Sequence, residues 1–530
     1  MAVITPQTEI RLVKCPLELS DLNQLTFANA AAQYTYFNGL SHIVTDNATY
    51  QRKDGYIRYP AKFDDIIQYN YVMYQNEAYS NKWFYAYIDK MEYISDGMTA
   101  IYISTDCFQT WQFDLTYKRT FVEREHTNDD TIGKNILDEG LQLGEFVCNT
   151  GDTGVIEFGG GPEGDYNLLC FQVTELVSGL GQAANTRRYS GIYSGLYMFG
   201  VRPQYADQVI DAYASATKSD SIVAIFYAPA KFFAARVQTS TLPGQVGTIY
   251  YSPVSPSEYS TVLTQATTIT MNSTIDGYTP KNNKLFTSPY NYIHFTNNSG
   301  TEVEYHYEDF KNNTAKFFVS GSICQGCSIR MVPVDYKGHA EAYAFGINAG
   351  KMPLCAWASD YYTNWVTQNA ANHAMTMLSA GASILTAPPT AEGVVSAGLS
   401  AFNSIGTMMA EYSRAERMPD QAKGNVNSGD LNFSARRYFF HYGKMHIKAE
   451  VAKSIDEYFS MYGYKTNRVK IPNTTGRTNW NFVKTIGCYI AGDIPQEDMA
   501  TIKGMFDAGV TLWHNPTTFM DYSQTNSIVV

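Results

Sequence analysis

The stretch Asn81-Lys-Trp-Phe-Tyr-Ala-Tyr-Ile88, followed by Asp96-Gly97 and then by Met98-Thr-Ala-Ile-Tyr-Ile-Ser-Thr105, decides the fold class. Both longer runs are rich in aromatic and β-branched residues, which favour strands. Asp-Gly between two such runs is a strong signal for a tight turn. The stretch therefore predicts an antiparallel β-hairpin.

Further segments of the chain have the same strand-like composition as this hairpin. Residues 108–115 and 117–123 read as further strands, and no helical period is visible before residue 150. Short β-like runs separated by Asn, Gly, Ser and Pro return over residues 220–345. We therefore expect an antiparallel sheet in the first part of the chain and one or two β domains in its middle.

Three segments show helical periodicity instead. They are residues 205–217, 446–462 and 495–508. Gly463 and Gly509 stand where a helix commonly ends, and Asp493 is a candidate N-cap for the last helix. The predicted fold class is mainly β, of the α+β type, with a few helices, of which the clearest lie in the last hundred residues.

Residues 370–410 differ from the rest of the chain because Glu392 is their only charged residue. Pro388-Pro389 must interrupt any helix that runs through them. A glycine cluster at residues 159–164 marks a loop and a boundary further upstream. These changes divide the chain into residues 1–150, 151–365, 366–430 and 431–530.

Composition argues against a dedicated nucleic-acid binder. The chain of 530 residues has a formal net charge of −11 and no run of Lys or Arg that would meet phosphates. An acidic wall still suits a protein through which DNA slides, because like charges repel. The start of the chain lacks a signal-peptide pattern, so we expect synthesis in a cytoplasm.

Two clusters could carry chemistry. Cys324 and Cys327 form one knuckle, with His339 as a possible third ligand, but no fourth ligand is apparent, so neither a metal nor another cofactor is predicted. Glu123 and Glu125 beside His126 could perform acid–base chemistry. Period-two spacing on a strand puts both acids on one face beside positive neighbours, and a salt-linked contact between subunits explains this equally well. We therefore predict that the chain is not an enzyme.

The uncharged segment allows three interpretations. It could form two core helices of a soluble domain, a transmembrane pair, or a membrane-active loop that stays hidden until it is triggered. The last 18 residues before Glu411 carry no charge, which is near the lower limit for spanning a bilayer. Several serines make insertion of one copy marginal, whereas assembled copies can share their polar groups.

Two blocks of sequence go beyond composition. The first comprises residues 33–38, 81–88, 108–114, 121–126 and 137–141, and the second comprises residues 462–470, 492–494 and 506–514. In this order and at these ends of the chain, they resemble the distal tail-knob proteins of small short-tailed bacteriophages that infect Gram-positive bacteria. The resemblance covers about 200 residues.

This resemblance implies an architecture and a set of partners. Residues 1–150 and 431–530 would form an antiparallel, tail-tube-like domain, with residues 151–365 inserted as β-rich knob domains. The chain would assemble with itself as a homo-hexamer and with other tail or collar proteins in the distal tail of the virion. Genomic DNA would pass through the ring without specific binding.

The resemblance also favours the third interpretation of the uncharged segment. Residues 366–430 would form an apolar loop that plugs the tube and then penetrates the host membrane. Its candidate membrane-active residues are Met375, Met377, Leu378, Ile384, Leu385, Val394, Val395, Leu399, Phe402, Ile405, Met408 and Met409. The alternative function is a tail-associated module that binds the cell wall, or a hydrolase of peptidoglycan or teichoic acid.

Overall fold

The computed structural model places most of the chain in two compact units. Unit 1 comprises residues 1–144, 277–285 and 448–530, and unit 2 comprises residues 145–276 and 286–447. The residues that the structure describes are 8–19, 22–51, 56–77, 80–156, 167–181, 188–189, 192–193, 196–216, 218, 221–229, 238–243, 247–253, 263–321, 328–351, 354–355 and 439–529. The glycine cluster at 159–164 and the apolar loop predicted at 366–430 lie outside them.

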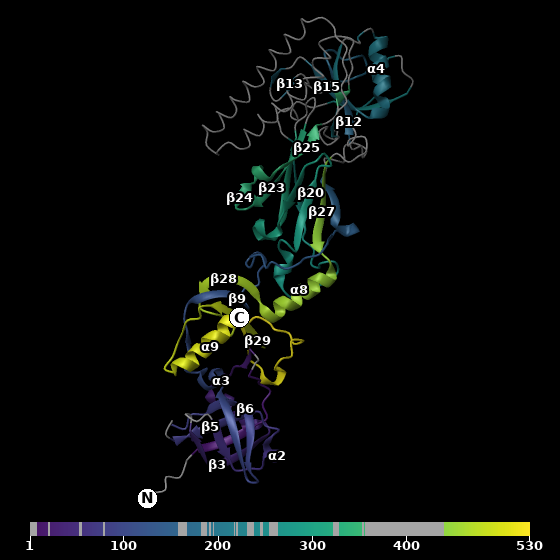
Figure 1. The fold of residues 1–530 in the computed structure, drawn as a ribbon. Coiled ribbons are helices and arrows are strands. Elements are labelled where there is room, and N and C mark those ends of the chain that lie inside the picture. The colour runs from purple at the N-terminus through teal and green to yellow at the C-terminus, as the bar shows by residue number, and fades with distance from the viewer. Residues whose placement is uncertain are drawn as a thin grey trace, which may run out of the picture. The chain divides into compact units, whose positions relative to one another are not determined.

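The first part of unit 1 is a closed β-barrel, drawn in purple in Figure 1. Its strands follow the order β1 (Thr8–Val13), β3 (His42–Gln51), β4 (Tyr56–Tyr59), β7 (Met98–Thr105), β6 (Phe84–Ser95) and β5 (Tyr71–Asn76). All its pairs are antiparallel. The predicted hairpin is confirmed, since β6 and β7 pair up to Ser95↔Met98 around a turn at Asp96-Gly97.

The second part of unit 1 is a five-stranded sheet that uses both ends of the chain. Its order is β2 (Asn23–Leu25), β31 (Val510–Trp513), β29 (Trp480–Ile486), β9 (Thr120–Glu125) and β28 (Tyr464–Lys470). Only the pair of β2 with β31 is parallel. A short two-stranded pair is formed by β8 (Thr116–Tyr117), which precedes β9 in the sequence, and β30 (Ile490–Ala491), which follows β29.

Alternation along β5 shows how the barrel and this sheet are joined. Val72 and Tyr74 belong to the apolar cluster inside the barrel. Tyr71 and Met73, which point to the opposite face of the strand, belong to a second cluster that contains Trp480 and Trp513 of the sheet. Because both faces of β5 are buried, the strand reads as a continuous apolar run.

Five helices accompany these strands in the described part of unit 1: α1 (Ala30–Gly39), α2 (Phe63–Ile66), α3 (Cys107–Trp111), α8 (Ala449–Tyr462) and α9 (Gln496–Ala508). The predicted helices at 446–462 and 495–508 are confirmed as α8 and α9. Gly463 follows α8 with φ of 65° and ψ of −154°, a backbone conformation that essentially only glycine adopts.

Three predictions for this region are wrong. Residues 108–115 do not form a strand, because Asp106 accepts a hydrogen bond from the Gln109 N–H and starts helix α3. Helix α1 was not predicted, and the side chain of Asn29 caps it. Asp493 does not cap α9, whose N-cap position is Pro495 with no side-chain hydrogen bond.

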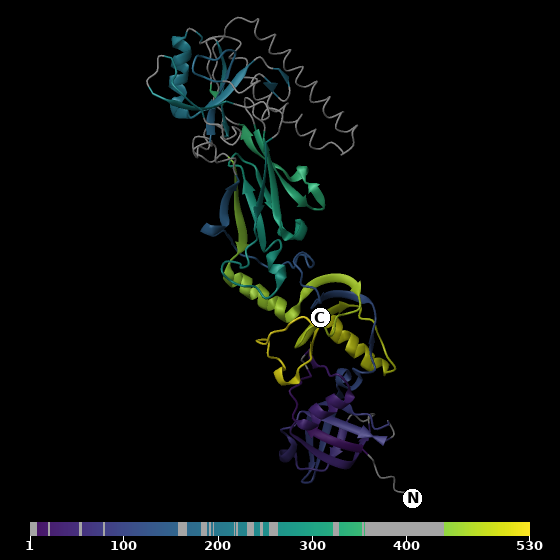
Figure 2. The same cartoon turned by 180° about the vertical axis from the view of Figure 1, so that it is seen from behind.

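Unit 2 contains three larger sheets. One has the order β10 (Phe146–Val147), β27 (Phe440–Ile447), β20 (Asn291–Thr296) and β21 (Glu302–Tyr305), with β11 (Thr153–Ile156) also on β27. The next has the order β19 (Leu263–Ile269), β22 (Ala315–Gly321), β23 (Ser328–Tyr336) and β24 (His339–Glu341), with β25 (Ile347–Lys351) also on β23. In Figure 2 the yellow-green β27 lies among blue and teal strands from the middle of the chain.

The third sheet has the order β17 (Gln238–Ser240), β18 (Ile249–Pro253), β15 (Tyr197–Val201), β12 (Asn167–Val173), β16 (Ile222–Pro229) and β26 (Leu354–Cys355). Beside it are the pair β13 (Arg188–Tyr189) with β14 (Ile192–Tyr193) and helix α4 (Ala206–Ser215), which confirms the helix predicted at 205–217. Val209, Ala212 and Tyr213 of α4 share one apolar cluster with the strands of this sheet. The mainly β class is therefore correct.

Candidate functional site: a buried charged junction and an exposed apolar row

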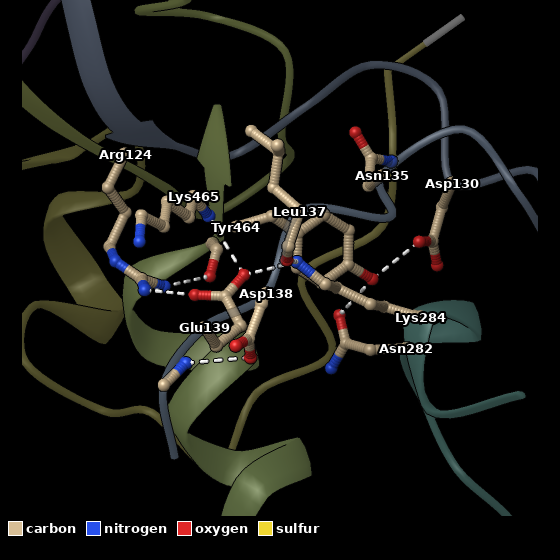
Figure 3. A network of polar contacts seen from close by, with 12 residues as sticks. Arg124, Asp130, Asn135, Leu137, Asp138, Glu139, Asn282, Lys284, Tyr464 and Lys465 are labelled. Atoms are coloured by element: carbon tan, nitrogen blue, oxygen red, sulfur yellow. Dashed lines mark hydrogen bonds and ion pairs between the residues drawn. The ribbon is translucent and has the colours of Figure 1, made fainter. Parts of the chain in front are cut away.

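A buried carboxylate organises the polar interior of unit 1. The side chain of Glu139 has no exposed area, although residues around it in the irregular segment 127–144 are largely exposed. It forms ion pairs with both Arg124 and Lys284, and it accepts a hydrogen bond of 3.0 Å from the Lys465 N–H (Figure 3). One side chain thus joins β9, residues 277–285 and β28.

The two cations of this junction are held from several sides. Arg124 also donates to the Gly463 carbonyl at 2.8 Å and lies 4.9 Å from the Tyr458 ring centroid. Lys284 donates to the Leu137 carbonyl at 2.7 Å, and only 2% of its side chain is exposed. Burial lowers the pKa of Lys284, while the nearby Glu139 acts in the opposite direction.

Two further carboxylates fix the same region. Asp456 of α8 is fully buried and accepts hydrogen bonds from the Lys281 and Asn282 N–H groups at 2.7 and 3.0 Å. Asp130 accepts from the Asn283 N–H at 3.0 Å and from the Tyr464 hydroxyl (Figure 3). Burial raises the pKa of Asp130 despite these bonds. Carboxylates from α8 and from segment 127–144 therefore hold residues 278–284 in place within unit 1.

The candidate acid–base cluster occupies the end of β9, but it does not form an active site. Glu125 is fully buried, pairs with Lys470, and accepts from the Asn473 N–H at 2.8 Å. Glu123 is one-third exposed and pairs with Lys484 at 3.0 Å. The register of β9 against β29 shifts between Glu123 and Glu125, and the two acids have different partners. The prediction that both lie on one face beside the same neighbours is therefore wrong.

His126 is the buried neighbour of these acids. Its Nδ1 accepts from the Phe482 N–H at 2.8 Å, so Nε2 carries the proton that is donated to the Ser460 carbonyl at 3.1 Å. Burial lowers the pKa of His126 to about 3. Both ring nitrogens are occupied, and the imidazole stays neutral at physiological pH. The ion pairs of this cluster lie within one chain, whereas the sequence predicted a salt-linked contact between subunits.

No site for a metal ion is apparent in the ranges that the structure describes, because no three His, Cys, Asp or Glu side chains converge there. His339 lies in β24, whereas Cys324 and Cys327 fall outside those ranges. All twelve candidate membrane-active residues, from Met375 to Met409, also fall outside them. Among the helices that are described, none is both long and apolar enough to cross a bilayer.

The second feature is a row of exposed apolar residues across the sheet of unit 1. Phe121 pairs directly with Val469 on one side and with Ile486 on the other, so all three side chains lie on one face. Their exposed fractions are 36%, 58% and 58%. Sequence reasoning missed this row because it becomes continuous only when β28, β9 and β29 are paired.

Helix α8 covers the other end of the same sheet face. Tyr462 contacts the Phe482 ring with centroids 5.2 Å apart, and Tyr458 lies against Arg124. Beyond Lys484 and Glu123 the helix no longer covers the face. Ile471 and Tyr489, which follow β28 and β29 in the sequence, are also 56% and 57% exposed. Contiguous exposed apolar surface of this kind marks a site of protein contact.

Comparison with known proteins identifies the family. A family model described as the C-terminal domain of the tail knob protein gp9 of Bacillus phage phi29 matches residues 255–527, which is more than half of the chain. A model of the N-terminus of caudoviral major tail proteins matches residues 6–116. The two models together account for both ends of the chain.

Individual relatives match over nearly the full length. The tail knob protein gp9 of Bacillus phage B103 is 25% identical over 95% of this chain and 95% of its own length. The corresponding protein of Bacillus phage phi29 is 24% identical over 98% of each. The solved structure of the bacteriophage C1 tail knob protein, gp12, has a TM-score of 0.64 at 14% identity, covers 98% of this chain and 100% of its own, and thereby supports the fold.

The family model, the named relatives and the shared fold agree with the resemblance first seen at the two ends of the sequence. The relatives carry the name of a structural tail component and not of an enzyme. This chain belongs to the tail knob proteins of short-tailed phages, which are structural parts of the virion tail and are made in the host cell.

Proposed function

We propose that six copies of this chain form a ring at the distal end of the tail and that unit 1 builds the wall of its channel. The exposed row of Phe121, Val469 and Ile486 carries this proposal. A monomer in water gains nothing from leaving three large apolar side chains side by side, whereas a subunit contact buries them. Other tail or collar proteins would hold the ring in the virion.

The buried junction suits such a wall. Glu139, Asp130 and Asp456 hold segments that are far apart in sequence in one arrangement. Charged groups that are buried and fully paired fix one geometry, because any displacement leaves a charge without its partner. The net charge of −11 would let DNA pass without sticking.

Native mass spectrometry of the purified full-length chain tests the ring. We expect a six-fold mass for the wild type and monomers for Val469→Glu, because a buried carboxylate without a partner opposes association. Ile67→Glu is the matched control, since Ile67 is equally exposed at 59% but lies outside the row. If the wild-type chain stays monomeric at a protein concentration of about tens of micromolar, as used in such an experiment, the proposed ring is wrong.

We further propose that residues 366–430 plug the channel and enter the host membrane during infection. The support is compositional, since this segment contains the chain's longest uncharged stretch. Deleting 372–412 should leave rings intact but abolish dye release from liposomes. A variant in which the same 41 residues are replaced by a Gly/Ser linker controls for length. Loss of the rings in both variants would instead assign the segment to the folded core.

A further inference from the structure

Strand β28 forms one open edge of the sheet in unit 1. Among the described strands it pairs only with β9, and the Lys465 N–H at its start is taken by Glu139. Three consecutive residues further along, from Asn467 to Val469, are exposed. Exposure of consecutive residues means that both faces of the strand are open. An unprotected edge of this kind is a template for pairing with another strand.

The charges around this edge are positive. Lys118 and Arg119 precede β9 and are exposed, and Arg468 on β28 is exposed as well, while Lys470 is already paired with Glu125. Arg119 reaches the Val469 carbonyl at 3.5 Å, so its charge lies beside the apolar row. In a chain with net charge −11, this is a cationic rim around an apolar surface.

A second open edge lies in the barrel. β5 pairs with β6 only from Phe84 to Tyr87, so Asp89–Ser95 have β7 as their sole described strand partner. The turn end of this hairpin, residues 89–97, is almost entirely exposed. Tyr93 and Ile94 there are 61% and 48% exposed. The hairpin therefore presents apolar side chains and unpaired backbone groups together.

The charges of this hairpin end complement those of the β28 edge. Asp89, Glu92 and Asp96 are acidic and Lys90 is the one cation, which gives a net charge of −2 from three acids and one lysine. All four residues are exposed, so their contacts within the hairpin can be exchanged for contacts with another copy. Both surfaces have exposed apolar side chains and an open strand edge, and their charges are opposite in sign.

We infer that the turn end of the β6–β7 hairpin of one copy docks on the β28 edge and apolar row of a second copy. The two surfaces are different parts of one chain, so the contact is head-to-tail, and such contacts close into rings when the rotation allows. Tyr93 and Ile94 would cover Val469 and Phe121, and the acids of the hairpin would face Arg119 and Arg468. This inference rests on the proposed ring and specifies its subunit contact.

Cysteine cross-linking tests the contact directly. Rings of the double variant Tyr93→Cys/Val469→Cys, oxidised or treated with a short bismaleimide, should give a ladder of covalent multimers. A mixture of the two single variants should give dimers only, because each copy then carries one half of the pair. Ile67→Cys/Val469→Cys is the matched control, since Ile67 is as exposed as Tyr93. The parent chain controls for the native cysteines.

Charge exchange adds a second, independent measurement. Arg468→Glu should raise the concentration at which rings form by about tenfold, and Glu92→Lys in the same chain should restore it. If rings are present by native mass but the double-cysteine variant cross-links no better than the control, the inference is wrong while the ring stands. If no rings form at all, the proposed function fails first.

Discussion

Units 1 and 2 stabilise their interiors by different means. In unit 1, three carboxylates and three cations are buried or largely buried within one region, namely Asp130, Glu139, Asp456, Arg124, Lys284 and Arg477. In unit 2 the largest described cluster is apolar and aromatic, with rings of β20, β21 and β22 in contact. Unit 1 thus adds a network of buried, paired charges to its apolar clusters, whereas aromatic packing dominates the largest described cluster of unit 2.

The largest effect should come from the centre of the charged junction. Glu139→Gln removes the partner of two buried cations, and we expect it to lower the free energy of unfolding of unit 1 by about 3–5 kcal/mol. Hydrogen exchange of unit 1 peptides in rising urea measures this. The control is Glu123→Gln, whose ion pair with Lys484 is partly exposed and should contribute about 0–1 kcal/mol. Equal losses in the two variants would refute the role of the junction.

Gly463, whose carbonyl accepts a hydrogen bond from Arg124, can be compared with Gly487 in a matched pair of substitutions. A Cβ at Gly463 would lie 2.1 Å from the Glu125 carbonyl oxygen, whereas Gly487 has the same φ of 65° and nothing within 4 Å. We expect Gly487→Ala to cost about 1–2 kcal/mol from the left-handed backbone alone. Gly463→Ala should cost about 2 kcal/mol more, because backbone must move. Similar melting temperatures for the two would show that the close approach is unimportant.

Acidification should act on unit 1 through its buried histidines. Burial lowers the pKa of His126 to about 3 and that of His514 to about 4. A folded-state pKa below the unfolded value of about 6.5 means that the contribution is complete above pH 6.5 and is lost as the pH falls towards these values. Going from pH 7 to pH 5 should therefore cost about 2 kcal/mol per histidine.

Urea unfolding of His126→Gln at both pH values isolates one of these contributions. The variant should lose about 2 kcal/mol less than the wild type between pH 7 and pH 5. His42→Gln is the control variant, because the side chain of His42 is only half-buried. An unchanged slope in His126→Gln would mean that another group dominates the acid response.

Unit 2 should respond to pH in the opposite direction. Burial raises the pKa of Glu308 to about 7, and its Oε2 atom has no hydrogen-bond partner among the described residues. A raised folded-state pKa gives a contribution that is complete below the unfolded value of about 4.5 and is lost as the pH rises through about 7. Glu308→Gln should therefore stabilise unit 2 by about 3 kcal/mol at pH 8 and by nearly nothing at pH 4.

The exposed Glu302, at 68%, provides the control, since Glu302→Gln should leave unit 2 unchanged at both pH values. Hydrogen exchange of unit 2 peptides reports this separately from unit 1. A loss of stability in Glu308→Gln at pH 8 would contradict the assigned direction of the pKa shift.

Local signals explain what the sequence predicted of the fold. Asp96-Gly97 between two β-rich runs sufficed for the hairpin, and the spacing of Val451, Ile455 and Phe459 before Gly463 sufficed for α8. Helix α3 was missed because it has only five residues, four of them buried, so no amphipathic period develops. Its one signal was Asp106, an N-cap residue that precedes Cys107.

The junction and the apolar row could not be predicted in the same way. Glu139 meets Lys284 and Lys465 across 145 and 326 residues of sequence, and nothing local distinguishes it from the exposed Asp138 beside it. Phe121 and Val469 each look like an ordinary strand residue. Only the pairing of β9 with β28 shows that they form one surface.

An image of the intact tail at a resolution that separates strands from helices would show which unit builds the channel wall. We expect six copies of unit 1 around the channel, with the β6–β7 hairpin of each copy on the β28 edge of the next, and residues 366–430 inside the lumen. A channel wall built from unit 2, with the row of Phe121, Val469 and Ile486 facing solvent, would contradict this arrangement.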